Sequence, residues 1–158
     1  MSPEQVAALL LPTQYPHLQL IESSIAREWI RAHAAEWDSV EFDVNLGTGV
    51  ALGPGFDQTT RDQARYLTQK RADLIARRGT VANIIEIKRR VDFGPMGQLL
   101  GYATLYHADF PGTTDLQLTA IGWDALQDAV EVLHAHGINV ETFPQLNVVQ
   151  VSASGKQR

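Results

Sequence analysis

Three charged side chains interrupt an otherwise apolar segment in the middle of the chain. Asp73 lies in "RADLIA", and Glu86 and Lys88 lie in "NIIEIKRR", where most neighbours are Leu, Ile or Ala. Gly79 between the two segments predicts a tight turn at Arg78-Gly79, because glycine readily adopts the positive φ of hairpin turns. We therefore expect two antiparallel strands that carry two acids and a base into a mostly buried hairpin.

The register of this hairpin decides whether the three side chains meet. With a connection of two or four residues, Asp73 faces Ile84, and Glu86 lies diagonally beside Asp73 on the same side of the sheet. Lys88 shares that side while Ile87 points the other way, and a three-residue turn would reverse this parity. The sequence thus predicts that Asp73, Glu86 and Lys88 converge.

Such a cluster is suited to hydrolysis of a phosphodiester. Two neighbouring carboxylates repel each other, which raises a pKa unless a cation lies between them. Mg²⁺ prefers carboxylate and carbonyl oxygens, often from only one or two acidic side chains. A lysine beside the ion stabilises negative charge or helps to orient and deprotonate a water. A structural ion network at a strand end is the alternative that these residues alone leave open.

Composition excludes several other classes of protein. The 158 residues suit one domain at 1–151 with a core at about 17–143, followed by a flexible tail at 152–158. The absence of cysteine excludes a disulfide framework and a thiolate zinc site. No apolar run suits a membrane span, and no export signal is recognisable. We expect a cytoplasmic protein, or one in a particle assembled there, such as a virion.

Charge is distributed unevenly along the chain. The net charge is −5, yet residues 61–90 carry nine basic side chains against three acidic ones. This segment would attract a polyanion, although a solvated charged face is the alternative. Its arginines are candidates for contacts with DNA phosphates, which would make affinity salt-sensitive: Arg71, Arg77, Arg78, Arg89 and Arg90.

Apolar periodicity and capping residues predict alternating helices and strands around the hairpin. Val40, Phe42, Val44 and Leu46 fall on one face of a strand at 39–46. The other expected strands lie at 116–122 and 138–143, and helices are expected at 2–10, 17–36, 95–108 and 123–137. The glycine-rich segment that follows residue 46 has room for a short strand at 49–52, and a surface helix or ordered loop is expected at 57–69.

This order predicts an α/β fold with a mixed sheet. An antiparallel meander of three strands is followed by parallel strands through helical crossovers, with helices packed on the sheet.

The arrangement resembles the PD-(D/E)xK nuclease superfamily, which has the restriction-endonuclease-like fold. The resemblance covers about residues 17–122, with Asp73 on the second strand of the meander and Glu86-Ile87-Lys88 on the third. Glu22 lies in a preceding helix, "LQLIESSIAREWI", and Gln98 in a following one, "GQLLGYATLY". Ala72 precedes Asp73 where the family often has proline, which leaves the carboxylate in place.

The resemblance implies a DNA nuclease that requires Mg²⁺ or Mn²⁺. Asp73 and Glu86 would bind the metal with the backbone carbonyl of Ile87, and Lys88 would position the water or stabilise charge. No sequence-reading element such as a helix-turn-helix is evident, so cutting is expected to be structure-directed or weakly specific.

Other assignments stay open. By the resemblance, Glu22 would support a metal-bound water or a second ion, and Gln98 would orient the site or contact phosphate. Glu22 is also compatible with complementing a helix dipole, and Gln98 with an ordinary helix position. The alternative function is a nuclease-like fold used as a structural or binding subunit, for instance in a phage particle, as a homo-oligomer or part of a larger assembly. A third is nucleic-acid binding without cleavage.

Overall fold

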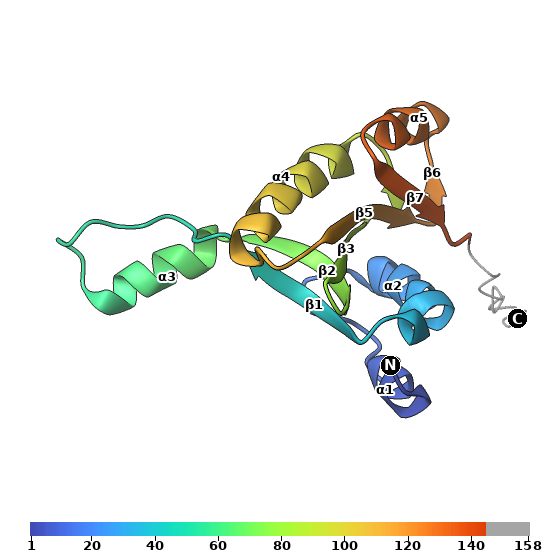
Figure 1. Ribbon diagram of the computed structural model, residues 1–158, viewed down its shortest axis with the longest axis horizontal. Helices are drawn as coiled ribbons and strands as arrows, with labels where there is room; N and C mark the ends of the chain where they lie inside the picture. The colour runs from blue at the N-terminus through green and yellow to red at the C-terminus, as the bar shows by residue number, and fades with distance from the viewer. Residues whose placement is uncertain (145–158) are drawn as a thin grey trace, which may run out of the picture.

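The computed structural model describes residues 1–144, so the expected tail at 152–158 lies outside the described part. Its centre is a five-stranded sheet in the order β1-β2-β3-β5-β7 (Figure 1). The first three strands form an antiparallel meander, and the last two run parallel to β3. This confirms the predicted α/β class with a mixed sheet. The strands are β1 (Ser39–Leu46), β2 (Lys70–Arg78), β3 (Val81–Ile87), β5 (Asp115–Gly122) and β7 (Ile138–Thr142).

Helices cover both faces of the sheet. On one face lies α2 (Leu20–His33), which continues into a 3₁₀ turn, η1 (Ala34–Glu36). On the other face lie α4 (Gly94–Asp109) and α5 (Gln127–Ala135), as Figure 1 shows. The short α1 (Pro3–Leu9) begins with the expected capping box. Among residues 1–144, no helix is long and apolar enough to cross a membrane.

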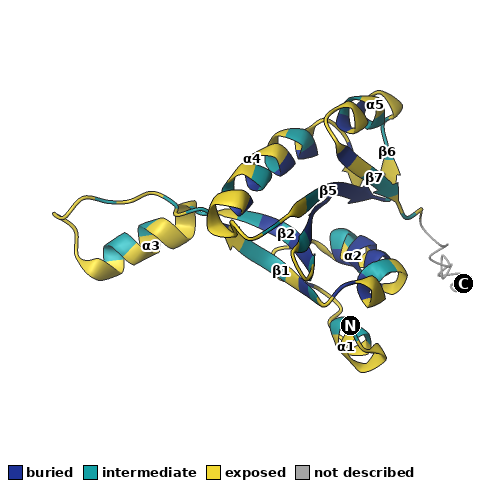
Figure 2. Ribbon diagram, in the orientation of Figure 1, coloured by how far each residue is buried: buried dark blue, intermediate teal, exposed yellow. Residues whose placement is uncertain are grey.

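Each face of the sheet has its own core. One cluster contains Ile25 and Trp29 of α2 together with Ile85 of β3. The other contains Leu99 of α4 together with Ile84 of β3. The buried residues therefore line both sides of the central strands (Figure 2). Burial on both faces explains why β3 reads as a continuous apolar run.

The single apolar face expected for β1 is wrong. Val40 and Phe42 pack with the α2 cluster, whereas Val44 and Leu46 pack with the α4 cluster. Asp43 between them has φ +54°, and its pairing with β2 is skipped. A positive φ at a non-glycine residue interrupts the regular alternation of side chains along the strand.

Two further expectations at element boundaries are also wrong. Residues 49–52 form no strand, because Gly47 and Gly49 have positive φ. The helix expected from residue 123 begins only at Gln127. Residues Asp124–Ala125 instead form β6, which pairs in parallel with β4 (Arg90–Val91) just after β3.

One segment projects from the body of the molecule. It comprises the loop after β1 and α3 (Gln58–Thr68), which fulfils the expectation of a surface helix at 57–69 (Figure 1). Asp57 caps α3, with its carboxylate accepting a hydrogen bond from the Thr60 N–H at 2.9 Å. We call residues 47–69 the arm.

Candidate active site

The β2–β3 hairpin has a two-residue connection, Gly79-Thr80. Arg78 pairs with Val81 and Leu74 with Ile85, and Gly79 has φ +56°. The expected turn at Arg78-Gly79, with Asp73 facing Ile84, is therefore displaced by one residue in each strand. The parity is unchanged, so continuing the register brings Asp73 level with Glu86.

At Asp73, the backbone pairing of β2 is interrupted both with β1 and with β3. The β2–β3 pairing runs only from Leu74 and Ile85 toward the turn. Beyond it, the Ile87 N–H donates to Asp73 Oδ2 at 2.8 Å, so a side-chain carboxylate takes the place of a main-chain acceptor. On the other side, the register places Asp43 opposite Asp73 without pairing them. The carboxylate of Asp73 is thus held next to the last residue of β3.

Glu86 brings a second carboxylate to the same place. Its side chain is buried, with only 1% of the residue exposed. The Lys88 Nζ donates to Glu86 Oε1 at 2.6 Å. Within residues 1–144, the other oxygen, Oε2, is buried and has no hydrogen-bond partner. A buried acceptor without a partner costs free energy, so this oxygen is suited to a ligand that neutralises it.

The electrostatics of the three side chains follow from this packing. Burial raises the pKa of Glu86 to about 7, the charge of Asp73 adds to the rise, and Lys88 opposes it. Burial also raises the pKa of Asp73, against the Ile87 N–H and Lys88, which lower it. Burial lowers the pKa of Lys88, but its hydrogen bond and charge interaction with Glu86 outweigh burial, so the net shift is upward. Lys88 is therefore a cation at neutral pH. It lies beside two carboxyl groups, each of which, when ionised, disfavours ionisation of the other.

Glu22 has a structural contact in the first turn of α2. Its Oε2 accepts a hydrogen bond from the Gln19 N–H at 2.9 Å, as in a helix cap. Its charge nevertheless raises the pKa of both Asp73 and Lys88. Glu22 therefore lies within electrostatic reach of the acid pair while its carboxylate serves α2.

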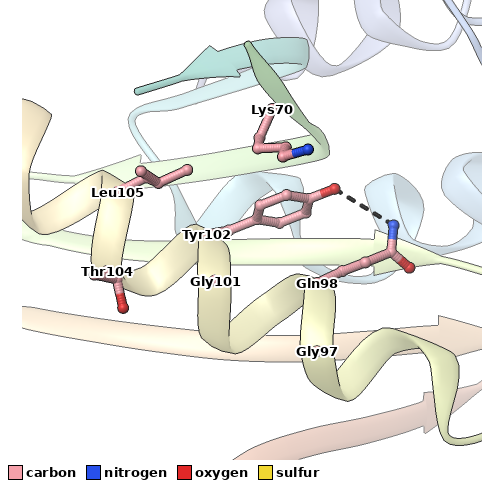
Figure 3. A pocket seen from close by; sticks show the side chains of 7 residues that line it. All are labelled: Lys70, Gly97, Gln98, Gly101, Tyr102, Thr104 and Leu105. Carbon is pink, nitrogen blue, oxygen red and sulfur yellow. Dashed lines mark hydrogen bonds between the residues drawn. The ribbon is translucent and has the colours of Figure 1, made fainter. Parts of the chain in front are cut away.

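Gln98 and Tyr102 face a cavity next to the acid pair. The Gln98 Nε2 donates to Tyr102 Oη at 3.4 Å. Together with Lys70 and Leu105 they line a cavity of about 630 Å³, in which the polar ends of Lys70, Tyr102 and Gln98 lie toward one end (Figure 3). Burial raises the pKa of Tyr102, and the charge of Glu86 adds to this. The cavity thus adjoins the acid pair, although the acids themselves do not line it.

The predicted arginines do not all lie at the site. Arg77 and Arg78 are at the turn end of the hairpin, where Arg77 pairs with Glu41 at 2.6 Å and Arg78 donates to the Glu36 carbonyl at 3.3 Å. Five residues of strand separate Asp73 from Arg78, which is about 17 Å. We had expected these two arginines beside the acids because they are close in the sequence. In the structure the extended strand places them far from the acids.

The other predicted arginines flank the site more closely. Arg89 and Arg90 follow Lys88 directly and line a separate cavity of about 480 Å³ with Trp123 and Asp124. Arg90 forms an ion pair with Asp124 at 2.9 Å, and the Arg89 guanidinium lies 5.9 Å from the centre of the Trp123 indole.

Sequence reasoning missed a charged group on β1 beside Asp73. Asp43 forms an ion pair with Arg71 at 3.3 Å and lies 3.1 Å from the His17 Nε2, and its charge raises the pKa of Asp73. Alternation along "SVEFDVNL" had placed Asp43 on the solvent face of a regular strand. The positive φ that turns it toward the site has no signal in the residue type, although aspartate tolerates this conformation better than most residues.

The metal-binding capacity of the site rests on two carboxylates. Within residues 1–144, no group of three or more His, Cys, Asp or Glu side chains is arranged to hold a metal ion. Mg²⁺ is often bound through one or two carboxylates while it keeps several waters, so a pair is chemically sufficient.

Comparison of the chain with protein-family models, curated proteins and solved structures found no match. The geometry around Asp73 and Glu86 is therefore what any functional assignment must be built on.

Proposed function

We propose that the chain is a metal-dependent phosphodiesterase that cleaves DNA, with a restriction-endonuclease-like fold of the PD-(D/E)xK kind. One observation carries the proposal: buried Glu86 has an oxygen without a hydrogen-bond partner in the described part of the chain, beside a second acid, Asp73, and in contact with Lys88. Two acids and a lysine around an unsatisfied oxygen are the groups that phosphodiester hydrolysis by a divalent cation requires. The element order supports the same fold, because an antiparallel meander precedes α4 and a strand parallel to β3.

The residues present fit a divalent cation. Asp73 and Glu86 would hold it, with the backbone carbonyl of Ile87 as a further oxygen ligand. Such a cation supplies Lewis acidity and lowers the pKa of water. It would also replace the proton that Glu86 retains because of its raised pKa, and so relieve the repulsion between the two acids.

The remaining side chains would act on the substrate and its charge. The ammonium of Lys88, in contact with Glu86, would stabilise charge that develops on the phosphate or would position the attacking water. Gln98 lines the cavity and interacts with Glu86, so its amide can donate to a phosphate oxygen of a bound substrate. Arg89 and Arg90, directly after Lys88, offer further contacts to the backbone of DNA.

Cleavage assays test the proposal directly. Plasmid, duplex and single-stranded DNA are incubated with Mg²⁺, Mn²⁺ or EDTA, and Asp73→Asn and Lys88→Ala are compared with wild type. Each substitution should lower the rate by a factor of about 100 or more, and EDTA should abolish cutting. Glu41→Gln, an equally small change at an exposed acid on the same sheet, should leave the rate unchanged. Cutting that persists in both site variants would reject these assignments.

A structural or binding subunit is the second candidate, and a specific contact favours it. Glu22 is engaged in capping α2, so its carboxylate has a structural contact in place of a ligand. This candidate predicts a stable oligomer or partner complex that neither cuts DNA nor binds Mn²⁺. Light scattering after size-exclusion chromatography and a calorimetric Mn²⁺ titration separate the two candidates, since the proposed nuclease must bind the ion.

A further inference from the structure

The arm is a packed element that stands away from the sheet (Figure 1). Its loop is fixed against its helix, because the Val50 N–H donates to Thr68 Oγ1 at 2.6 Å. Gly49 lies so close to the Arg65 carbonyl that a side chain at this position would collide with the helix backbone. None of the residues of α3 is buried, so the arm contributes little to either core (Figure 2).

Exposed apolar side chains are concentrated on the arm. Nine large apolar residues are exposed among residues 1–144, and four of them belong to this segment of 23 residues: Val50, Phe56, Tyr66 and Leu67. Phe56 is 51% exposed and Tyr66 is 53% exposed. About half of each aromatic side chain is thus exposed on a projecting loop and helix, where it is available to a partner.

Basic side chains accompany these rings. Arg61 and Arg65 lie one turn apart on α3, and Arg71, directly beyond the arm, places its guanidinium 4.6 Å from the centre of the Tyr66 ring. The two acids of the arm are engaged locally, Asp57 as the cap of α3 and Asp62 as the acceptor of a hydrogen bond from Gln58. In a chain of net charge −5, this combination of rings and bases favours a polyanion with flat, stackable groups.

The arm leads directly to the candidate active site. Its last residue is followed by Lys70, which begins β2 and lines the cavity shared with Gln98 and Tyr102 (Figure 3). Asp73 lies three residues further along the same strand. The cavity of about 630 Å³ is therefore lined by Lys70 next to the arm and by Gln98, which interacts with Glu86.

We propose that the arm binds a single-stranded segment of nucleic acid and delivers it along this cavity toward Asp73 and Glu86. Bases stack on Phe56 and Tyr66, and Arg65 and Lys70 contact phosphates. Single strands are favoured over duplex because only unpaired bases present their faces to an aromatic ring. A second copy of the chain is the less suited occupant, since four apolar side chains offer less than the roughly 800 Å² per partner of a stable interface. The destination rests on the function proposed above, but binding at the arm does not require cleavage.

Binding in EDTA separates this proposal from catalysis. Affinity for a fluorescent single-stranded oligonucleotide and for its duplex is measured by anisotropy with full-length wild type, Phe56→Ala, Tyr66→Ala and Arg65→Gln. Each aromatic substitution should weaken single-strand binding about tenfold, with a smaller effect on duplex. Arg65→Gln should reduce the slope of log affinity against log salt by about 0.7. Leu11→Ala, which removes an even more exposed apolar side chain outside the arm, should bind like wild type.

The outcomes are distinguishable from those of the cleavage assay. Unchanged single-strand affinity in Phe56→Ala and Tyr66→Ala overturns the arm proposal, even if wild type cuts DNA. Loss of affinity in these variants supports it, even if wild type proves inert with every metal. A wild-type dimer that Tyr66→Ala converts to a monomer, with DNA affinity retained, also overturns the proposal, because the arm would then be a contact between copies.

Discussion

Replacing Glu86 with Gln isolates the cost of burying a charge at the site. Burial and the charge of Asp73 raise the pKa of Glu86 from 4.5 to about 7. Between these two pH values the folded protein keeps a proton that the unfolded chain has released. The stability contributed by this proton is fully present below pH 4.5 and is lost as the pH rises through 7. The difference between the two pKa values corresponds to a loss on the order of 3 kcal/mol in the metal-free protein.

Glutamine has nearly the shape of glutamate and cannot ionise, so Glu86→Gln should not suffer this loss. In urea denaturation with EDTA, we expect the free energy of unfolding of wild type to fall by about 3 kcal/mol relative to Glu86→Gln between pH 4.5 and pH 8. The comparison cancels the histidines and the acids that do not interact with Glu86, which both proteins share, and it includes any change that the substitution causes in the pKa of Asp73. Glu28→Gln, which replaces a half-buried acid of α2 outside the Asp73–Glu86 pair, serves as the control variant. A constant difference between wild type and Glu86→Gln across this range would refute the reasoning.

Other perturbations test the site and the elements around it. Mg²⁺ at pH 8 should raise the melting temperature of wild type and not that of Glu86→Gln, as measured by differential scanning fluorimetry, because binding to the folded state stabilises it. Trp29→Ala should lower the free energy of unfolding by about 3–5 kcal/mol in urea, because it leaves a cavity in the α2 core. Gly79→Ala should cost about 1–2 kcal/mol in the same assay, since Gly79 has φ +56° with open space around it. Asp57→Ala should accelerate amide hydrogen exchange within α3 while leaving exchange in the sheet unchanged.

The sequence was most informative where one local signal decided the structure. Alternation and β-branched residues located β1 and β5, and the capping box at Ser2 located α1. The hairpin parity also followed from local chemistry, because Gly79 can serve either of two neighbouring two-residue turns. Which of the two forms depends on packing of the whole sheet, so the register was displaced by one residue in each strand.

Features set by distant contacts were not predictable. Asp43 adopts a positive φ opposite Asp73, and nothing in its immediate neighbours marks this break in β1. The helix expected at 123–137 loses its first turn because backbone hydrogen bonds join Trp123 to Arg89 and Leu126 to Val91. Long-range backbone pairing therefore prevailed over helix propensity at this point.

The ends of the arm have a simple relation to the sheet. Leu46 and Lys70 are paired opposite each other as the last rung between β1 and β2. The chain thus leaves the domain and re-enters it at adjacent points, as it does in a hairpin with a tight loop. Replacing the intervening 23 residues with a longer, shorter or unrelated segment would therefore alter no strand. This position is suited to insertions that change which ligand the domain binds.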